Sequence, residues 1–257
     1  MPGETGEPAP ELHLQDCTTL GYFHGRRLTR IGRKTVSGRI TRRREPFREA
    51  LLTPSRDPIM WHLQNHDALL FDCDGTLADT MPAHFLAWLH LSQRHGLSFD
   101  ENRFYALGGR PTRDIVATLA REAGVDVDLE TAVQLKEELF LTRLEHVAAI
   151  DPVVDVVRRS RGRIPIAVVT GGHRAVCERI LAHIGLSGAF DLIVASEDTA
   201  RHKPDPDPFL EAARRLGVRP ERCVVWEDSD LGIAAATTAG MEWIDVRSFH
   251  APKRITP

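Results

Sequence analysis

The sequence predicts an α/β protein, with a parallel sheet covered by helices on both faces and a helical unit inserted after the first strand. Three observations support this fold class. From residue 68 onward, short apolar runs alternate with helical stretches, as is typical of parallel βαβ units. Residues 73–165 separate the first two runs, far more than one crossover helix requires. Most runs also end at or beside a polar or acidic residue, where ligands bind in open α/β sheets.

Five apolar runs are the predicted strands. In chain order they are Ala68–Asp72, Ile166–Thr170, Leu192–Ser196, Cys223–Glu227 and Trp243–Val246. Helical patterns lie at 119–123 and 133–144 within the insertion, and at 231–239 before the last strand. Because the carboxyl ends of parallel strands meet at one edge of a sheet, we expect the residues that end these runs to share a site. An insertion beside that site can close over a substrate and exclude water.

Composition narrows the class of protein. The 257 residues are 42% hydrophobic, which is enough to bury the core of one large domain or two modest ones. The sequence has neither the roughly 20 consecutive apolar residues of a membrane span nor the layout of a secretory signal. Its four cysteines are scattered without a CxxC pair, which argues against a disulfide framework or a zinc site. We therefore expect a cytoplasmic protein without membrane contact.

Residues 1–65 differ in charge from the rest of the chain. They carry 11 Lys and Arg against 7 Asp and Glu, a net charge of +4 in a chain of net charge −3. They lack sustained periodicity, so we expect a disordered basic extension. The basic run from Arg26 to Arg44 has no accompanying aromatic platform, and nucleic acid is not the expected partner. Met60, just before the first strand, is an alternative start of the chain.

Two carboxylates follow the first strand at a spacing of two. In an extended chain Asp72 and Asp74 project to the same side and can share one site. One carboxylate can attack phosphorus, while the other protonates the leaving alcohol and later deprotonates the hydrolytic water. We assign Asp72 as the nucleophile and Asp74 as the acid and base. Taken alone, the Asp-Gly pair is also compatible with a simple tight turn.

Three later polar positions are ambiguous on local grounds. Thr170, followed by two glycines, can present a hydroxyl and backbone N–H groups to a phosphate or can cap a helix. Lys203 lies in a Pro-rich stretch, where a lysine is usually solvated. Glu227 and Asp228 precede the helix predicted at 231–239 and can cap it. Their order along the chain, rather than any one of them, decides between these interpretations.

That order resembles the haloacid dehalogenase superfamily of phosphatases. Phe71-Asp72-Cys73-Asp74-Gly75-Thr76-Leu77 resembles the family signature, and Thr170, Lys203 and Glu227-Asp228 match its second, third and fourth motifs. The resemblance covers about residues 66–248 and implies a Rossmann-like parallel sheet core with an inserted helical cap domain. The implied division is a core at 66–80 and 150–248, a cap at 81–149 and a C-terminal tail at 249–257.

The resemblance also implies Mg²⁺ as the cofactor. A phosphate dianion beside several carboxylates is a like-charge cluster that needs cations, and magnesium prefers oxygen ligands. The implied ligands are a carboxylate oxygen of Asp72, the backbone carbonyl of Asp74 and the side chain of Asp228, with Glu227 in the same acidic pair. Lys203 would supply a second cation for the charge that shifts during transfer.

The position of the insertion, with Asp79-Thr80 and His84, resembles the β-phosphoglucomutase-like branch of the superfamily. Two further segments, 107–112 and 239–247, resemble bacterial fructose-1-phosphate and 6-phosphogluconate phosphatases. The resemblance implies a substrate-binding set of Gly109, Arg110, Arg113, His84 and Gly171. The two arginines are equally compatible with surface charges, and His84 with a satisfied buried histidine.

We therefore predict a Mg²⁺-dependent phosphatase that hydrolyses a small phosphorylated metabolite through an aspartyl-phosphate. The expected substrate is a sugar phosphate of the fructose 1-phosphate or 6-phosphogluconate type, and the expected assembly is a monomer or weak homodimer. An inactive binding protein with a nucleic-acid-binding basic tail is an alternative of another class.

A β-phosphoglucomutase-type mutase is a second alternative. A mutase must hold a second phosphate, yet the positions of its cap Lys and Arg read Gly108 and Thr112, and that of its distal-site Ser reads Gly172. Arg110, Arg113 and Arg174 are nearby, however, so a clamp for the second phosphate formed by these arginines stays open as an alternative.

Overall fold

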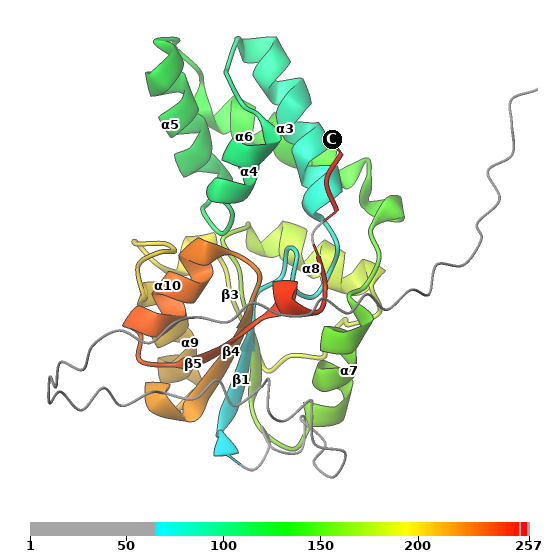
Figure 1. Ribbon diagram of the computed structural model, residues 1–257, viewed down its shortest axis with the longest axis vertical. Helices are drawn as coiled ribbons and strands as arrows, with labels where there is room; N and C mark the ends of the chain where they lie inside the picture. Colours follow the sequence, from blue (N-terminus) through cyan, green and yellow to red (C-terminus); the bar gives the residue numbers. More distant parts are fainter. Residues whose placement is uncertain (1–64, 252, 256–257) are drawn as a thin grey trace, which may run out of the picture. The chain divides into compact units, whose positions relative to one another are not determined.

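The computed structural model describes residues 65–251 and 253–255 (Figure 1). The basic run at 26–44 and Met60 lie outside these residues. A five-stranded parallel sheet forms the centre of the described part, with the strand order β3-β2-β1-β4-β5. Its strands are β1 (Ala68–Phe71), β2 (Ile166–Val169), β3 (Leu192–Val194), β4 (Cys223–Glu227) and β5 (Glu242–Asp245). The predicted α/β fold class is confirmed.

β1 is the central strand, and its residues alternate between two apolar cores. Leu69 and Phe71 belong to the core that includes residues 153–157 and 176–184, whereas Ala68 and Leu70 belong to the core with Phe209. Successive side chains of a strand point to opposite faces, so a run that is apolar throughout requires helices on both sides. Every residue of β1, β2 and β4 is accordingly buried.

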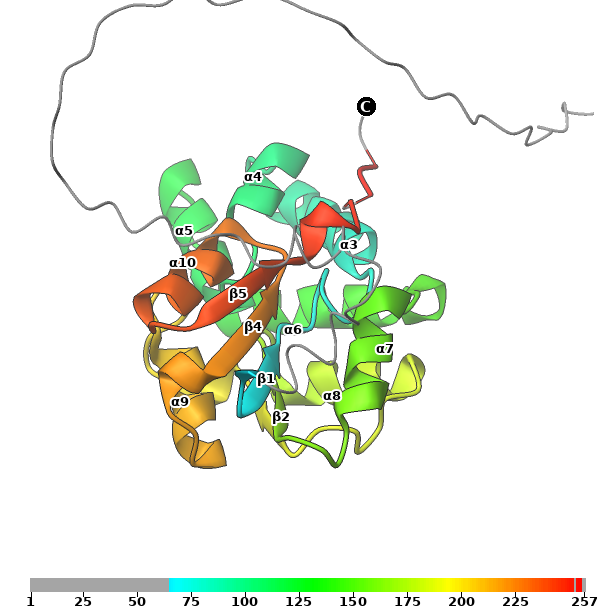
Figure 2. The same cartoon turned by 60° about the horizontal axis from the view of Figure 1, so that its bottom comes forward.

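Two pairs of helices supply these covers, as Figures 1 and 2 show from two directions. One face carries α7 (Asp151–Ser160) and α8 (Arg174–His183). The other carries α9 (Asp207–Leu216) and α10 (Asp230–Thr238). Short 3₁₀ turns at Ser196–Asp198, Pro220–Arg222 and Val246–Ser248 complete the connections.

Residues 81–146, between β1 and β2, are helical, and we call them the inserted helical segment. Its elements are α3 (Met81–His95), α4 (Glu101–Ala106), α5 (Thr112–Ala123), α6 (Leu129–Leu141) and a 3₁₀ turn (Leu144–His146). The segment has an apolar core of its own, which includes Phe85, Trp88, Phe104 and Leu119. Figure 1 shows it beyond the carboxyl ends of the strands. It therefore lies where the sequence analysis expects a ligand.

After the last 3₁₀ turn the chain runs back to the inserted helical segment (Figure 1). Lys253 Nζ lies 2.9 Å from Asp79 Oδ2, in the connection between β1 and α3. The Tyr105 hydroxyl of α4 donates to the Lys253 carbonyl at 2.8 Å, and the Ile255 amide donates to Glu101 Oε1 at 2.8 Å. The C-terminal residues thus link the sheet side of the protein to α4.

Within residues 65–251 and 253–255, every helix is too short or too polar to cross a membrane.

Candidate active site

Strand register brings the predicted polar residues to one edge of the sheet. Phe71 pairs with Val168 of β2 and with Trp226 of β4, so the three central strands end side by side. The Asp72 amide continues this pattern by donating to the Trp226 carbonyl at 2.9 Å. Side chains that follow β1, β2 and β4 therefore emerge together.

Lys203 reaches this edge from the loop before α9 and is buried. Its Nζ donates to Asp72 Oδ1 at 2.7 Å and to the Val169 carbonyl at 3.1 Å, and it lies 3.6 Å from Glu227 Oε2. Only 2% of Lys203 is exposed, and its ammonium stands 5.1 Å from the ring centre of Phe209. A buried ammonium requires such partners, so the interpretation of Lys203 as a solvated surface lysine is wrong.

Three carboxylates form an acidic cluster beside this ammonium. Oxygen atoms of Asp72, Glu227 and Asp228 lie within 4.8 Å of one another. Burial, together with the nearby Glu227 charge, raises the pKa of Asp72 to about 8, and the same two causes raise the pKa of Asp228 well above its usual value. The possible ligand atoms are all carboxylate oxygens, and the raised pKa values of Asp72 and Asp228 mean that negative charge is unfavourable there without a cation. Such a set of oxygens fits a hard divalent cation such as Mg²⁺.

A glycine makes room for this cluster. Gly75 turns the chain with φ +81°, and a Cβ there would lie 2.1 Å from Asp228 Oδ2. The Thr76 hydroxyl then donates to Asp228 Oδ1 at 3.1 Å. The turn after β1 therefore both leaves room for Asp228, which follows β4, and holds its carboxylate by a hydrogen bond.

Helix capping does not account for the acidic pair after β4. The N-cap of α10 is Ser229, whose hydroxyl oxygen accepts from the Gly232 amide at 3.0 Å and which donates to Glu227 Oε1. Glu227 itself is fully buried. Thr170 is likewise not the N-cap of α8, a position that His173 occupies. Glu227, Asp228 and Thr170 are therefore not helix N-caps, and their side chains can take part in the site.

Asp74 lies in a different electrostatic environment from Asp72. Its Oδ1 accepts from the Thr80 hydroxyl at 2.8 Å and lies 2.9 Å from His84 Nε2. Burial alone would raise the pKa of Asp74, but the contacts with His84 and Thr80 outweigh it and hold that pKa at about 2. Because an ionised carboxylate can only accept, Nε2 of His84 carries the proton of this hydrogen bond.

A charged network extends from His84 into the inserted helical segment. Lys136 Nζ lies 3.0 Å from His84 Nδ1 and 3.2 and 3.3 Å from the two carboxylate oxygens of Glu137. The Thr112 hydroxyl donates to Glu137 Oε1 at 2.7 Å. The His84 ring stacks on Phe140, with ring centres 3.7 Å apart. This network joins α5 and α6 to the acid and base candidate.

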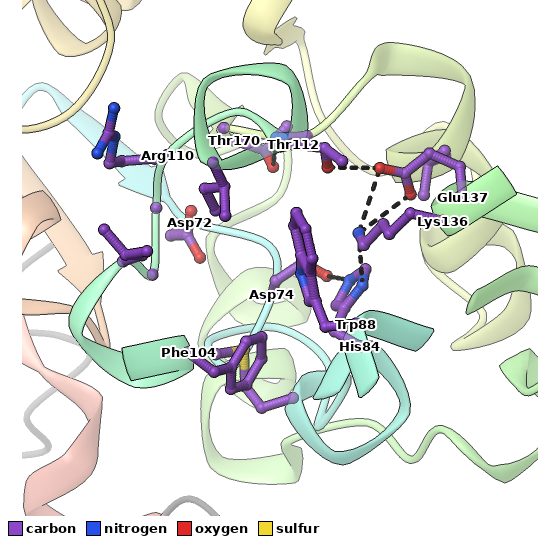
Figure 3. Close-up of a pocket in the computed structure, with 18 of the residues that line it drawn as sticks. Asp72, Asp74, His84, Trp88, Phe104, Arg110, Thr112, Lys136, Glu137 and Thr170 are labelled. Carbon is purple, nitrogen blue, oxygen red and sulfur yellow. Dashed lines mark hydrogen bonds and ion pairs between the residues drawn. The ribbon is translucent and has the colours of Figure 1, made fainter. Parts of the chain in front are cut away.

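Figure 3 shows the pocket enclosed by these groups. Asp72, Asp74 and Thr170 line it from the sheet, and Lys136 and Glu137 line it from α6. Its remaining wall is mostly apolar or glycine and includes Met81, Trp88, Phe104, Leu107, Gly108, Gly109, Ile115, Gly171 and Gly172. Polar groups therefore stand at opposite sides of a largely apolar pocket, an arrangement suited to a ligand with polar groups at both ends.

The structure brings most of the predicted substrate-binding residues to this pocket, but not all. His84, Gly109, Arg110 and Gly171 line it. The Arg110 guanidinium, however, is directed away from the Lys136 and Glu137 side (Figure 3). Arg113 is half-exposed and pairs with Glu130 at 2.9 Å, so it stands as the surface charge that the sequence analysis gave as its alternative.

Sequence reasoning missed Lys136 and Glu137 as pocket residues, and it considered Thr112 only as the residue at the position of the mutase's cap Arg. All three are buried polar residues on amphipathic helices, at positions where the helical pattern alone expects apolar side chains. The sequence signal that could have identified them was a polar or charged residue at a position on the apolar face of a helix.

The fold and the site together define the class of protein. Residues 69–246 match the haloacid dehalogenase-like hydrolase family, and the chain belongs to that family.

Similar proteins refine this placement. Fructose-1-phosphate phosphatase YqaB of Escherichia coli K12 is 42% identical over 72% of this chain and 98% of its own length. Hexitol phosphatase A of the same organism is 32% identical over 70% of this chain and 82% of its own length. Among solved structures, CbbY from Rhodobacter sphaeroides in complex with phosphate has a TM-score of 0.63 at 29% identity, covering 70% of this chain and 85% of its own. β-Phosphoglucomutase of Clostridium difficile, at 22% identity over 70% of this chain and 84% of its own, shares the fold with a TM-score of 0.64.

Proposed function

We propose that this protein is a Mg²⁺-dependent phosphatase of small phosphorylated carbohydrates that acts through an aspartyl-phosphate on Asp72. The observation that carries the proposal is the pairing of two differently tuned carboxylates in one pocket. Asp72 is held by the Lys203 ammonium at 2.7 Å beside an acidic cluster, whereas Asp74 is held by His84 and Thr80. One is placed to attack phosphorus and the other to move a proton.

In the first step, Asp72 attacks phosphorus and the bond from phosphorus to the substrate oxygen breaks. Asp74 gives a proton to that leaving oxygen. Its pKa of about 2 belongs to the pocket without substrate, and the negative charge of a bound phosphate raises it. Lys203 stays in contact with Asp72 and stabilises the charge that passes through the phosphoryl group.

In the second step, water attacks phosphorus and gives a proton to Asp74, which releases phosphate and restores Asp72. Thr170 assists in holding the phosphoryl oxygens. Its hydroxyl oxygen already accepts from the Gly172 amide at 3.0 Å, so its proton is available to a phosphate oxygen. Mg²⁺, held by Asp72, the Asp74 carbonyl and Asp228, would neutralise phosphate charge when bound.

The inserted helical segment is proposed to act as the cap over this chemistry. Its loop at 108–110 meets the loop after β2 so closely that a Cβ on Gly171 would lie 2.3 Å from the Gly109 carbonyl oxygen. Such contact excludes water while the phosphoryl group is on the enzyme. A cytoplasmic location and a monomer or weak homodimer remain the accompanying proposals.

The test is phosphate release from fructose 1-phosphate, 6-phosphogluconate and β-glucose 1-phosphate, with Mg²⁺, with chelator and with Asp72→Asn. We expect release that requires Mg²⁺ and falls at least about a thousandfold in Asp72→Asn, since the nucleophile is lost. Release that survives Asp72→Asn would contradict the aspartyl-phosphate, and silence with every substrate would contradict phosphatase activity.

A phosphosugar mutase is the second candidate, because β-phosphoglucomutase of Bacillus subtilis is 29% identical over 68% of this chain and 80% of its own. Two of the three arginines considered for a clamp on the second phosphate pair with carboxylates elsewhere, whereas Arg110 lines the pocket. Arg113 pairs with Glu130, and Arg174 pairs with Asp198. Conversion of β-glucose 1-phosphate to glucose 6-phosphate, measured in the same reactions, would favour the mutase.

A further inference from the structure

Glu137 is a carboxylate in the pocket wall that the proposed chemistry does not use. It belongs to α6, is 9% exposed and lines the pocket opposite the sheet edge. Figure 3 shows it with Lys136 and Thr112 on one side of the pocket and Asp72 on the other. A substrate whose phosphate lies at Asp72 would therefore turn its remote end toward this group.

The hydrogen-bonding capacity of Glu137 is not exhausted. Oε1 accepts from the Thr112 hydroxyl at 2.7 Å and from Lys136 at 3.2 Å, whereas the described contact of Oε2 is Lys136 at 3.3 Å. Each carboxylate oxygen can accept more than one hydrogen bond, so Oε2 has room for a further donor. An ionised carboxylate has no proton to give, and its partner must supply one.

The positive charge of Lys136 on this side of the pocket is already paired before a substrate binds. The Lys136 ammonium is shared between Glu137 and the His84 ring, and the Arg110 guanidinium is directed elsewhere. Burial opposes ionisation of Glu137, but Lys136 and His84 outweigh it and lower its pKa. Among the residues that the structure describes, the cation beside Glu137 is Lys136, which is already paired, so an anionic group arriving here would face a second buried negative charge, which is costly.

We propose that Glu137 accepts a hydrogen bond from a hydroxyl at the end of the substrate remote from the phosphate, and thereby excludes substrates with a carboxylate or second phosphate at that end. The inference rests on the proposed phosphatase function and narrows its substrate class. Neutral sugar and polyol monophosphates are accepted, and phosphorylated sugar acids and bisphosphates are not.

Sorbitol 6-phosphate and 6-phosphogluconate are a matched pair for the test, because they differ by a hydroxymethyl group against a carboxylate at C1. We expect the wild-type protein to show a kcat/KM at least about tenfold higher for sorbitol 6-phosphate, the scale of a single misplaced group in a binding pocket. Glu137→Gln keeps an acceptor but removes the charge, so the preference should shrink by about tenfold, chiefly through faster hydrolysis of 6-phosphogluconate.

The control is Glu138→Gln, an exposed carboxylate one residue away on the same helix, which should leave the ratio unchanged. A wild-type ratio near or below one overturns the inference even if Glu137→Gln does not fold. A folded Glu137→Gln protein with the wild-type ratio also overturns it. p-Nitrophenyl phosphate has no remote polyol end, so its hydrolysis tests the phosphatase proposal without testing the role of Glu137. If none of the three substrates releases phosphate, the result counts against the phosphatase proposal itself.

Discussion

At the scale of single residues, the two aspartates after β1 show how environment assigns roles to identical side chains. Burial and Glu227 raise the pKa of Asp72 to about 8, while His84 and Thr80 overcome burial and hold that of Asp74 at about 2. Lys203 alone does not offset the carboxylates around Asp72, whereas His84, Thr80 and Lys136 together keep Asp74 ionised. Such a separation between neighbouring carboxylates is typical of a nucleophile paired with a proton-transfer group.

The raised pKa of Asp72 predicts how the metal-free protein responds to pH. In the unfolded chain an aspartate titrates near 4, so between about pH 4 and pH 8 the folded protein retains a proton that the unfolded chain has lost. The free energy of unfolding should therefore fall as pH rises across this window. With chelator present, we expect the melting temperature to decline from pH 5 to pH 8, and Mg²⁺ to restore it most at the upper end.

Asp72→Asn should weaken this pH dependence, because the amide does not titrate, whereas Asp228, whose pKa is also raised, still does. Asp126→Asn, at an exposed position, should keep the wild-type slope. Calorimetric melting curves at four pH values, with and without Mg²⁺, measure all three proteins. An equal decline in the Asp72→Asn protein would show that another group carries the effect.

At the scale of elements, the loop after β2 and the loop before α5 contact each other at two glycines, Gly171 and Gly109. A Cβ on Gly171 would lie 2.3 Å from the Gly109 carbonyl oxygen, so Gly171→Ala must push the two loops apart. We expect KM to rise by about tenfold or more because the loops would no longer meet around the substrate. Steady-state kinetics with the preferred sugar phosphate measure the change.

Gly185→Ala is the control for this substitution. Its Cβ would meet nothing within 4 Å, but its φ of +75° strains an alanine. It should lower stability by about 1 kcal/mol and leave KM unchanged. If Gly171→Ala behaves like Gly185→Ala, closure of the two loops is not part of substrate binding.

The elements themselves were largely predictable from sequence, and the helical partners of the site were not. Each predicted strand matches an observed one within two residues, because short apolar runs buried on both faces leave a strong pattern. Arg113 was misplaced because it follows Thr112 by one position on α5, about 100° around the helix, and so lies off the buried face. Glu137 was missed because its approach to the pocket depends on how α6 packs.

The same contrast holds within the site. Asp72, Asp74, Thr170, Lys203 and the acidic pair after β4 follow sheet strands or their loops, and parallel pairing fixes where strands end. Contacts such as that of Lys136 with His84 join two helices of the insertion, whose mutual packing no local pattern specifies. The positions of the residues at the sheet edge were therefore predictable, while those of the buried polar groups on α5 and α6 required the structure.

At the scale of the whole described chain, the C-terminal residues tie α4 to the connection between β1 and α3. Lys253 pairs with Asp79 at 2.9 Å, and the Ile255 amide donates to Glu101 at 2.8 Å. Deletion of residues 250–257 removes the partners of two buried carboxylates, Asp79 and Glu101, so it should lower the melting temperature. The apolar cores lie before residue 250, however, so the fold should remain. We expect faster amide hydrogen exchange in residues 101–106, measured by mass spectrometry.

Arg219→Ala supplies the comparison, because it removes an exposed ion pair with Glu221 far from this contact in sequence. Its exchange in residues 101–106 should match that of the wild type. Unchanged exchange in the deleted protein would mean that the C-terminal contacts do not restrain α4.

The central place of β1 also orders events during synthesis. Its partners β2 and β4 begin at residues 166 and 223, so β1 leaves the ribosome long before it can pair. The inserted helical segment draws its apolar core from residues 81–135 and needs no strand to complete it. Contacts close in sequence form faster than distant ones, so helices α3 to α6 can assemble first. The nascent chain would then carry a folded helical unit before Asp72, the proposed nucleophile, is held in a sheet.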